Sequence, residues 1–353
     1  MVGRVRLGVI GAAGKIGAMR VKSILDEPRA ELAAVMDLDV DGATARAQGA
    51  PAFSDLDRFL DVSMDAVVIS TPAHVREPLC MAAFARGLHV LSEKPLHNTV
   101  EGARRIHQAA REKGLQLGGG FNMRYYPAFA FLHDVLRDGT IGEPDHLRVF
   151  GGHEGLPKFA HDWEYRADKS GGGALWDVGI HMTDMARHLM GDITEVYGVA
   201  TNRVWQVEGS EDNAMAILRA PGGLAAIYQA TWIEWRGYRS VVEIHGSRGM
   251  ARAAYAPMET LLLTMDRPGG RPRMRRNRFR GTQIRERIWS WKVTAQDSFA
   301  RELGEFLDLI DGRREGLRIA DGDAALRAVE VAAAIPESHR TGAPVKLPAL
   351  GGQ

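Results

Sequence analysis

The stretch GAAGKIGA, residues 11 to 18, follows directly on the apolar run RVRLGVI at residues 4 to 10. In a dinucleotide-binding Rossmann domain, the first strand enters a glycine-rich turn that leads directly into a helix. The spacing departs from the usual G-x-G-x-x-G, because Gly11 and Gly14 lie three positions apart, whereas the Gly14-x-x-Gly17 half is regular. Two hypotheses follow from the loop alone: a dinucleotide site with one extra residue, or an ordinary glycine-rich turn.

An acidic residue ends the second strand-like segment, residues 31–36. Asp37 lies 20 residues beyond Gly17, which is the interval at which a carboxylate holds the adenosine ribose. A carboxylate there accepts a hydrogen bond from the 2′-hydroxyl and repels a 2′-phosphate. The sequence therefore favours the dinucleotide hypothesis, with NAD as the cofactor in preference to NADP, although Asp39 and Asp41 stand nearby.

Strand-like and helix-like segments alternate through residues 1–121, which predicts an α/β Rossmann domain with a doubly wound parallel sheet. In residues 122–353 several strand-like segments follow one another directly, which predicts an α+β domain with a large, open, mainly antiparallel sheet. We expect the first domain to bind the dinucleotide and the second to bind substrate and to oligomerise. The helices expected in the second part are 128–137, 174–190, 294–311 and 322–338.

Composition and charge exclude several functional classes. The 353 residues are 45% hydrophobic and 25% charged with a formal net charge of +1, which is typical of a soluble globular protein and argues against a nucleic-acid or membrane-surface partner. The single cysteine, Cys80, fits a reducing compartment. We find no signal peptide and no apolar stretch long enough to cross a bilayer, so we expect a cytoplasmic protein.

Two stretches carry candidate catalytic side chains, LSEKPL at 91–96 and SGGGALWDVGIHMTD at 170–184. Lys94 follows the fourth predicted strand, at the sheet edge where ligands bind in such folds. Asp177 and His181 stand four apart in a predicted helix, so they share a face, and His181 can take a proton from a hydroxyl near neutral pH. The alternatives are a solvated lysine and a surface ion pair; without a third clustered ligand, we expect no metal.

These motifs resemble those of the Gfo/Idh/MocA oxidoreductases, which include inositol dehydrogenases, glucose-fructose oxidoreductase and other sugar dehydrogenases. The resemblance extends over nearly the whole chain, and E-K-P together with G-G-G-A-L-x-D-x-G-x-H is highly specific. The matching segments are ISTP at 69–72, AFARGLHVLSEKPL at 83–96, GFNMRYYPAF at 120–129, DGTIGEP at 138–144 and SGGGALWDVGIHMTDMARHLMG at 170–191. The chain departs from the family in its longer glycine loop and in Arg76, where many relatives carry a histidine.

The resemblance implies a catalytic site of Lys94, Asp177 and His181. His181 would remove the substrate hydroxyl proton as hydride leaves for the nicotinamide, Lys94 would stabilise the developing alkoxide, and Asp177 would tune the histidine. A cis Lys94–Pro95 bond is also implied. The implied cofactor contacts are Gly11, Ala13, Gly14, Lys15, Ile16, Asp37, Thr71, Pro72, Glu93 and Lys94. The implied substrate contacts are Lys94, Asn122, Arg124, Tyr125, Trp163, Asp177 and His181.

The expected function is that of an NAD-dependent oxidoreductase acting on a secondary alcohol of a sugar, cyclitol or related polyol. A homodimer or homotetramer formed through the C-terminal sheet is expected. The alternatives are redox-assisted glycoside cleavage with tightly held NAD, against which the intact E-K-P motif counts, and a non-catalytic sugar sensor. Chemistry like that of dihydrodipicolinate reductase would fit the loop but not the other motifs. The nine arginines within residues 267–287 would suit an anionic ligand or nucleic acid, but the nearly neutral charge of the whole chain favours a solvated hairpin or an oligomer contact.

Overall fold

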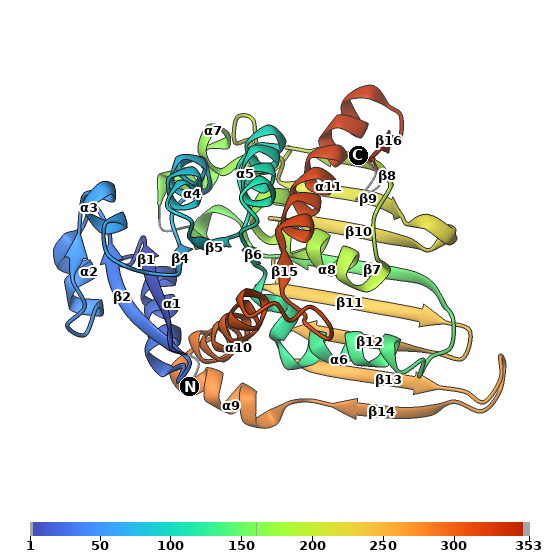
Figure 1. The fold of residues 1–353 in the computed structure, drawn as a ribbon. Coiled ribbons are helices and arrows are strands. Elements are labelled where there is room, and N and C mark those ends of the chain that lie inside the picture. The colour runs from blue at the N-terminus through green and yellow to red at the C-terminus, as the bar shows by residue number, and fades with distance from the viewer. Residues whose placement is uncertain (1–2, 160, 349–353) are drawn as a thin grey trace. The chain divides into compact units, whose positions relative to one another are not determined.

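The computed structural model describes residues 3–159 and 161–348, and the chain divides into two compact units (Figure 1). The first unit contains the chain up to Asn122 together with Lys292–Leu326, and the second contains Met123–Trp291 and the chain from Arg327 onward. The first change of unit falls between Asn122 and Met123, and the predicted boundary lies one residue earlier. The return of Lys292–Leu326 to the first unit is not part of the prediction; it occurs because Leu303, Phe306 and Leu307 join the apolar core there.

A seven-stranded sheet of order β15-β6-β5-β4-β1-β2-β3 forms the centre of the first unit. Its strands are β1 Val5–Ile10, β2 Ala30–Met36, β3 Ala52–Phe53, β4 Ala66–Ile69, β5 His89–Glu93, β6 Leu117–Gly120 and β15 Ala320–Asp321. All neighbours pair in parallel except β15 with β6, which confirms the predicted doubly wound sheet. The order reverses between β1 and β4, and such a reversal opens a ligand crevice at the carboxyl ends of the strands.

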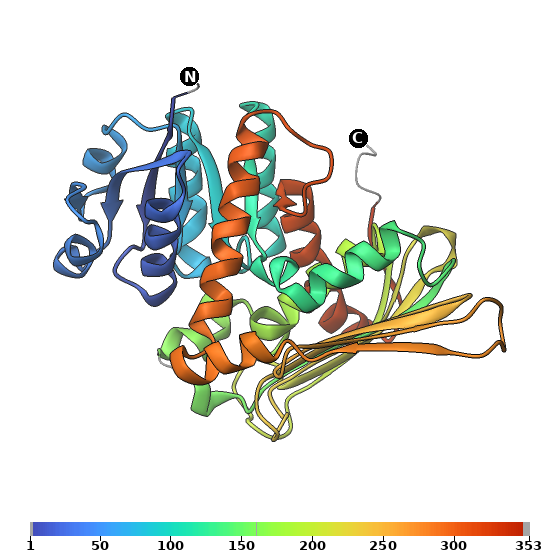
Figure 2. The same ribbon diagram turned by 90° about the horizontal axis from the view of Figure 1, so that it is seen from below.

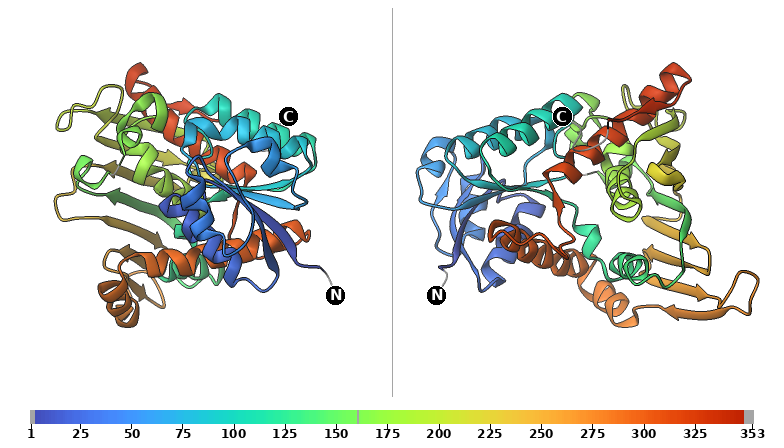
Figure 3. Two further views of the ribbon diagram at one scale, coloured as in Figure 1. Left: turned by 90° about the vertical axis from the view of Figure 1, so that its left-hand side faces the viewer. Right: turned by 45° about the vertical axis from the view of Figure 1, so that its right-hand side comes forward.

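Helices cover both faces of this sheet. They are α1 Lys15–Asp26, α2 Val40–Arg46, α3 Leu56–Leu60, α4 Arg76–Ala85, α5 Val100–Glu112 and α10 Lys292–Ile310. α4 and α5 pack together on one face, whereas α1 and α10 pack together on the other (Figures 1 and 3). The prediction missed α2 and α3, which are too short to show a hydrophobic period and begin instead at the carboxylate caps Asp39 and Asp55.

A nine-stranded sheet of order β14-β13-β12-β11-β7-β10-β9-β8-β16 forms the second unit. Its strands are β7 Pro144–Gly152, β8 Glu195–Thr201, β9 Asn213–Arg219, β10 Ala225–Thr231, β11 Arg239–Gly246, β12 Gly249–Tyr255, β13 Glu259–Thr264, β14 Arg273–Asn277 and β16 Val345–Lys346. Only the central pair β7–β10 is parallel, so the mainly antiparallel sheet is confirmed. The arginine-rich segment supplies the fully exposed edge strand β14 and the helix α9 Arg280–Trp289.

One face of this second sheet is covered by α6 Pro127–Arg137 and α8 Ile180–Met190, as Figure 2 shows for α6. Buried and exposed residues alternate along β9 and β10, so the opposite side chains of these strands face solvent. Helix α11, Gly322–Thr341, begins in the first unit and continues in the second, where the Ser338 hydroxyl accepts a hydrogen bond from the Gly198 N–H of β8 at 2.9 Å.

Candidate functional site

The glycine loop joins β1 to α1, and backbone contacts set its shape. Gly11 has a φ of +85°, a conformation that glycine adopts without strain. A side chain on Gly17 would place its Cβ 1.9 Å from the Gly11 carbonyl oxygen, so this position requires glycine. The extra residue is accommodated because the Ala13 N–H donates to the Asp37 carboxylate at 2.9 Å. Gly14, the N-cap of α1, brings no side chain between the first helical turn and an approaching phosphate.

The acidic residues after β2 differ in what they do. Asp37 directly follows β2, and its two oxygens accept hydrogen bonds from the N–H groups of Ala13 and Asp39. The Asp39 carboxylate accepts the Gly42 N–H and thereby caps α2. Asp37 is therefore the acid of this group that contacts the glycine loop, and its predicted hydrogen bond to the ribose stays a prediction.

Lys94 directly follows β5 at the carboxyl end of the parallel strands, and its bond to Pro95 is cis, as the resemblance implies. Buried Arg76, at the start of α4, donates to the carbonyl of Glu93 at 2.5 Å and to that of Pro95. It also donates to the Thr71 carbonyl at 2.9 Å. Arg76 therefore holds the backbone on both sides of Lys94. Burial lowers the pKa of Arg76 to about 10, which still leaves it charged at neutral pH.

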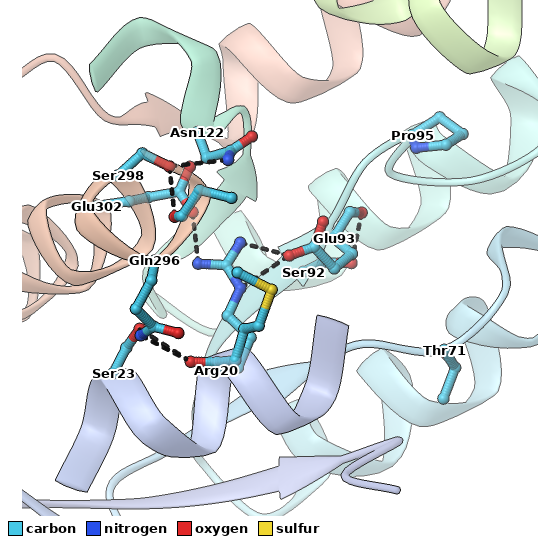
Figure 4. A network of polar contacts seen from close by, with 12 residues as sticks. Arg20, Ser23, Thr71, Ser92, Glu93, Pro95, Asn122, Gln296, Ser298 and Glu302 are labelled. Atoms are coloured by element: carbon cyan, nitrogen blue, oxygen red, sulfur yellow. Dashed lines mark hydrogen bonds and ion pairs between the residues drawn. The ribbon is translucent and has the colours of Figure 1, made fainter. Parts of the chain in front are cut away.

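The side chain of Glu93 points to a second buried arginine, Arg20 of α1 (Figure 4). Arg20 Nε lies 2.7 Å from Glu93 Oε1, and its Nη1 lies 2.5 Å from Glu302 Oε2 of α10. The guanidinium also stacks over the Phe299 ring, 4.1 Å from its centroid. Burial lowers the pKa of Arg20, but the carboxylates of Glu93 and Glu302 outweigh this effect and leave it raised. The predicted cofactor contact Glu93 thus has its carboxylate engaged within the first unit.

Arg20 and Glu302 form a buried charged group beside Glu93 that the sequence prediction missed. One feature of the sequence could have indicated Arg20, namely a charged residue on the apolar side of a helix. Arg20 lies among the buried residues Met19, Val21 and Ile24 of α1. Such a charge requires a buried partner, but the sequence alone does not say which.

Asp177 lies in a π-helical turn, Leu175–Gly179, which precedes the α-helix α8 that carries His181. The predicted helix over 174–190 is present, but its first turn is π-helical and only the remainder is α-helical. The start of this segment is anchored by the half-buried Glu211, whose carboxylate accepts the N–H groups of Gly173 at 3.0 Å and Leu175 at 2.7 Å. Burial raises the pKa of Glu211, and these amide hydrogen bonds oppose that effect.

Two further side chains, neither predicted, contact the Asp177 carboxylate. His153 follows β7 and Trp232 follows β10, and these strands are parallel neighbours whose ends meet at one sheet edge. His153 Nε2 lies 2.5 Å from Asp177 Oδ2, and the Trp232 indole N–H donates to the same oxygen at 3.1 Å. The sequence signal was weak, since each is a single polar or aromatic residue after a strand.

The other predicted substrate residues lie in different surroundings. Asn122 is buried in the first unit and donates to the Ser298 hydroxyl at 2.9 Å (Figure 4). Arg124 is buried in the second unit in an ion pair with Asp184 of α8, at 2.8 Å from Nε to Oδ2. Tyr125 is buried and Trp163 is half-buried. The structure thus places Asp177 and His181 in adjoining segments of the second unit, and Lys94 with the predicted cofactor contacts in the first.

Within residues 3–159 and 161–348, no group of three or more His, Cys, Asp or Glu side chains is arranged to hold a metal ion. None of the helices in that part of the chain combines the length and the apolar character needed to span a membrane.

Comparison with known proteins matches residues 5–121 to the oxidoreductase family with an NAD-binding Rossmann fold, and residues 129–252 to the GFO/IDH/MocA C-terminal domain. A dTDP-3,4-didehydro-2,6-dideoxy-alpha-D-glucose 3-reductase from Streptomyces antibioticus is 34% identical over 73% of this chain and 78% of its own length. A 1,5-anhydro-D-fructose reductase from Ensifer adhaerens is 32% identical, but the match spans only 54% of this chain and 56% of that protein. The crystal structure of GenD2 from gentamicin A biosynthesis, in complex with NAD, is 25% identical with a TM-score of 0.80, covering 99% of this chain and 98% of that one.

The buried ion pairs of Arg20 generate a prediction about stability. Replacing Arg20 with Met leaves the Glu93 and Glu302 carboxylates buried without their cation, and we expect the first unit to lose about 3–5 kcal/mol of unfolding free energy. Lys22→Met on the same helix is the matched control, because Lys22 pairs with Asp26 on the surface and contributes about 0.3–0.5 kcal/mol. Urea unfolding of both variants measures the difference. Equal midpoints would show that the Arg20 pairs do not stabilise the fold.

Proposed function

The chain belongs to the Gfo/Idh/MocA family of NAD-binding oxidoreductases, and we propose that it transfers hydride between NAD(H) and a secondary alcohol of a sugar, cyclitol or related polyol. Its relatives are dehydrogenases and reductases, so the chain is an oxidoreductase of CH–OH groups. The substrate class comes from those relatives, whose names specify a deoxysugar nucleotide and an anhydrosugar.

The observation that carries the proposal is the place of Lys94. β1 and β5 run parallel in one sheet, so the glycine loop after β1 and Lys94 after β5 stand at the same edge. Arg76 holds the peptide groups on both sides of Lys94 by hydrogen bonds, so the backbone that carries the Lys94 side chain has a defined position. A cation at this edge can meet a substrate oxygen beside a dinucleotide held by the loop.

His181, Lys94 and Asp177 have different roles in the proposed reaction. NAD(H), when bound, accepts or supplies the hydride. In the oxidation direction His181 takes the proton of the substrate hydroxyl, while the Lys94 ammonium donates a hydrogen bond to the same oxygen and stabilises its developing negative charge. Asp177 stabilises the charged form of His181. In the reduction direction His181 returns the proton to the new alkoxide. Two alternatives are less well supported by the sequence. The intact Glu93-Lys94-Pro95 motif counts against glycoside cleavage, and the presence of both Lys94 and His181 counts against a non-catalytic sugar sensor.

The proposed catalytic residues Lys94 and His181 lead to a prediction about turnover. We expect Lys94→Ala and His181→Ala each to lower kcat by about 100-fold or more, because a positioned acid–base group contributes roughly 10²–10⁴-fold. The dissociation constant of NADH should change little, since neither side chain is proposed to hold the adenosine end. Nicotinamide absorbance with a panel of myo-inositol, levoglucosan, 1,5-anhydro-D-fructose and nucleotide sugars measures turnover, and NADH fluorescence measures binding. Wild-type turnover in either variant would refute the assigned role.

Asp37 is proposed to select NAD over NADP. Its carboxylate already accepts the Ala13 N–H, so it is fixed at the point where the glycine loop meets the end of β2. A negative charge held there stabilises binding of a 2′-hydroxyl and opposes a 2′-phosphate.

We therefore expect Asp37→Ala to reduce the ratio of NADP to NAD dissociation constants by about tenfold, which corresponds to about 1.4 kcal/mol. Asp39→Ala is the control, because Asp39 caps α2 and should leave that ratio unchanged. Fluorescence titration with NADH and NADPH measures both constants. If selectivity changed in Asp39→Ala alone, the carboxylate that binds the ribose would be Asp39 and the proposal for Asp37 would be wrong.

We propose that two copies of the chain associate through the exposed face of β8, β9 and β10. Tyr197, Ile217 and Ile227 are direct neighbours across these strands, and Val199 and Met215 form the next pair. The exposed fractions of these five side chains range from 38% to 62%. A contiguous apolar surface of this kind is typical of a protein interface.

Charges on this face should separate the copies. We expect Ile217→Asp combined with Ile227→Asp to convert an oligomer into a monomer, because the carboxylates would be desolvated in the interface. Met81→Asp, on the exposed side of α4, is the control. Size-exclusion chromatography with light scattering gives the mass. A double variant with wild-type mass would place the interface elsewhere.

A further inference from the structure

We propose that His153 is a positioning residue of the active site, whose imidazole N–H fixes the orientation of the Asp177 carboxylate. The inference rests on the proposed function, because it takes Asp177 as a residue that acts on substrate or on His181. All the contacts that carry it lie within the second unit.

A backbone amide determines which nitrogen of His153 carries the proton. The Gly155 N–H donates to His153 Nδ1 at 3.0 Å, so Nδ1 presents a lone pair and the neutral ring is protonated at Nε2. Nε2 lies 2.5 Å from Asp177 Oδ2 and therefore donates to it. Position 155 requires glycine, since its φ is +77° and a Cβ there would lie 2.5 Å from the Trp205 indole nitrogen.

The ring of His153 is held in place by packing. Its side chain is 7% exposed, and it lies nearly parallel to the Tyr238 ring, with 6.2 Å between centroids and 7° between planes. The Phe159 ring meets it edge to face at 5.7 Å. On the backbone, His153 donates to the Thr231 carbonyl at 3.1 Å. Because these contacts restrict rotation of the imidazole, its N–H points in one direction.

The same oxygen of Asp177 receives the Trp232 indole N–H at 3.1 Å. Two donors from the ends of β7 and β10 therefore converge on Oδ2, and rotation of the carboxylate would break both hydrogen bonds. The Asp177 side chain remains 31% exposed, in contrast to the buried His153. His153 and Trp232 thus support the carboxylate from the protein interior while part of it stays accessible to a reactant.

Two substitutions separate the two nitrogens of His153. The amide nitrogen of Gln reaches about as far as Nε2, so His153→Gln can retain the donor to Asp177 but not the acceptor for Gly155. The amide oxygen of Asn lies near the place of Nδ1, so His153→Asn retains that acceptor but not the donor to Asp177.

We expect His153→Asn to lower kcat by about 10–100-fold, the usual effect of losing an orienting partner, with little change in the KM for NAD(H). His153→Gln should stay within about threefold of wild type, which a purely structural role of the ring would not produce. Steady-state kinetics use the member of the sugar and polyol panel that turns over fastest, and thermal melting checks folding. Equal losses in the two variants would overturn the proposal.

A double variant shows whether His153 acts through Asp177. In the Asp177→Asn background, His153→Asn should cause no further loss of kcat, whereas multiplicative losses would overturn the proposal. If Asp177→Asn alone kept wild-type kcat, the proposed function would fail at Asp177 whatever His153 does. If Asp177→Asn lost kcat but both His153 variants matched wild type, only the inference about His153 would fail.

The tautomer provides a measurement that needs no substrate. Nitrogen-15 NMR of the histidine rings, assigned by the signal lost in His153→Gln, should show His153 protonated at Nε2 and not at Nδ1 at pH 7. A ring protonated at Nδ1 would overturn the proposal.

Discussion

The buried guanidinium of Arg20 is the constraint on which the first unit depends. A charge without solvent is stable only beside opposite charges, and Arg20 has one carboxylate from the end of β5 and another from α10. The two ion pairs connect α1 to α10 and to the last residue of the strand that leads to Lys94, beside the apolar contacts that α10 makes with the core. Arg76 completes this arrangement from the other side through the carbonyls of Glu93 and Pro95. The backbone around Lys94 is held by two buried cations that need not touch substrate.

In the second unit the side chains of His153 and Trp232 support the candidate residue Asp177 in a comparable way. Asp177 receives N–H groups from His153 and Trp232, which emerge from parallel strands at one sheet edge. The turn that carries Asp177 is itself anchored by Glu211 through two backbone amides. The π-helical geometry of this turn is a local departure of a kind found often at functional sites.

Local sequence patterns were sufficient to predict much of the fold, and the site residues that they indicate stay predictions. The apolar run before GAAGKIGA predicted β1, and the interval to Asp37 identified the acid that contacts the loop. The family motifs implied the cis bond at Lys94–Pro95. Partners distant in the chain could not be predicted, because nothing in the pattern around Arg20 indicates Glu302.

The same limit applies to single contacts in the second unit. The burial of Arg124 against Asp184 depends on how α8 packs, and the hydrogen bond from His153 to Asp177 depends on the register of β7 with β10. A periodic pattern predicts that a helix or strand exists. It carries no information on which side chains meet once these elements have packed.

The division of the chain has a consequence for how the protein is made. Arg20 and Glu93 leave the ribosome early, but Glu302 is synthesised only after nearly all of the second unit. During translation the Rossmann sheet can form while Arg20 still lacks one of its two carboxylates and α1 lacks the apolar cover of α10. The first unit can therefore complete its native core only once residues 292–326 have been made, and a nascent chain arrested before residue 292 would leave the α10-facing side of α1 uncovered and open to chaperones and proteases.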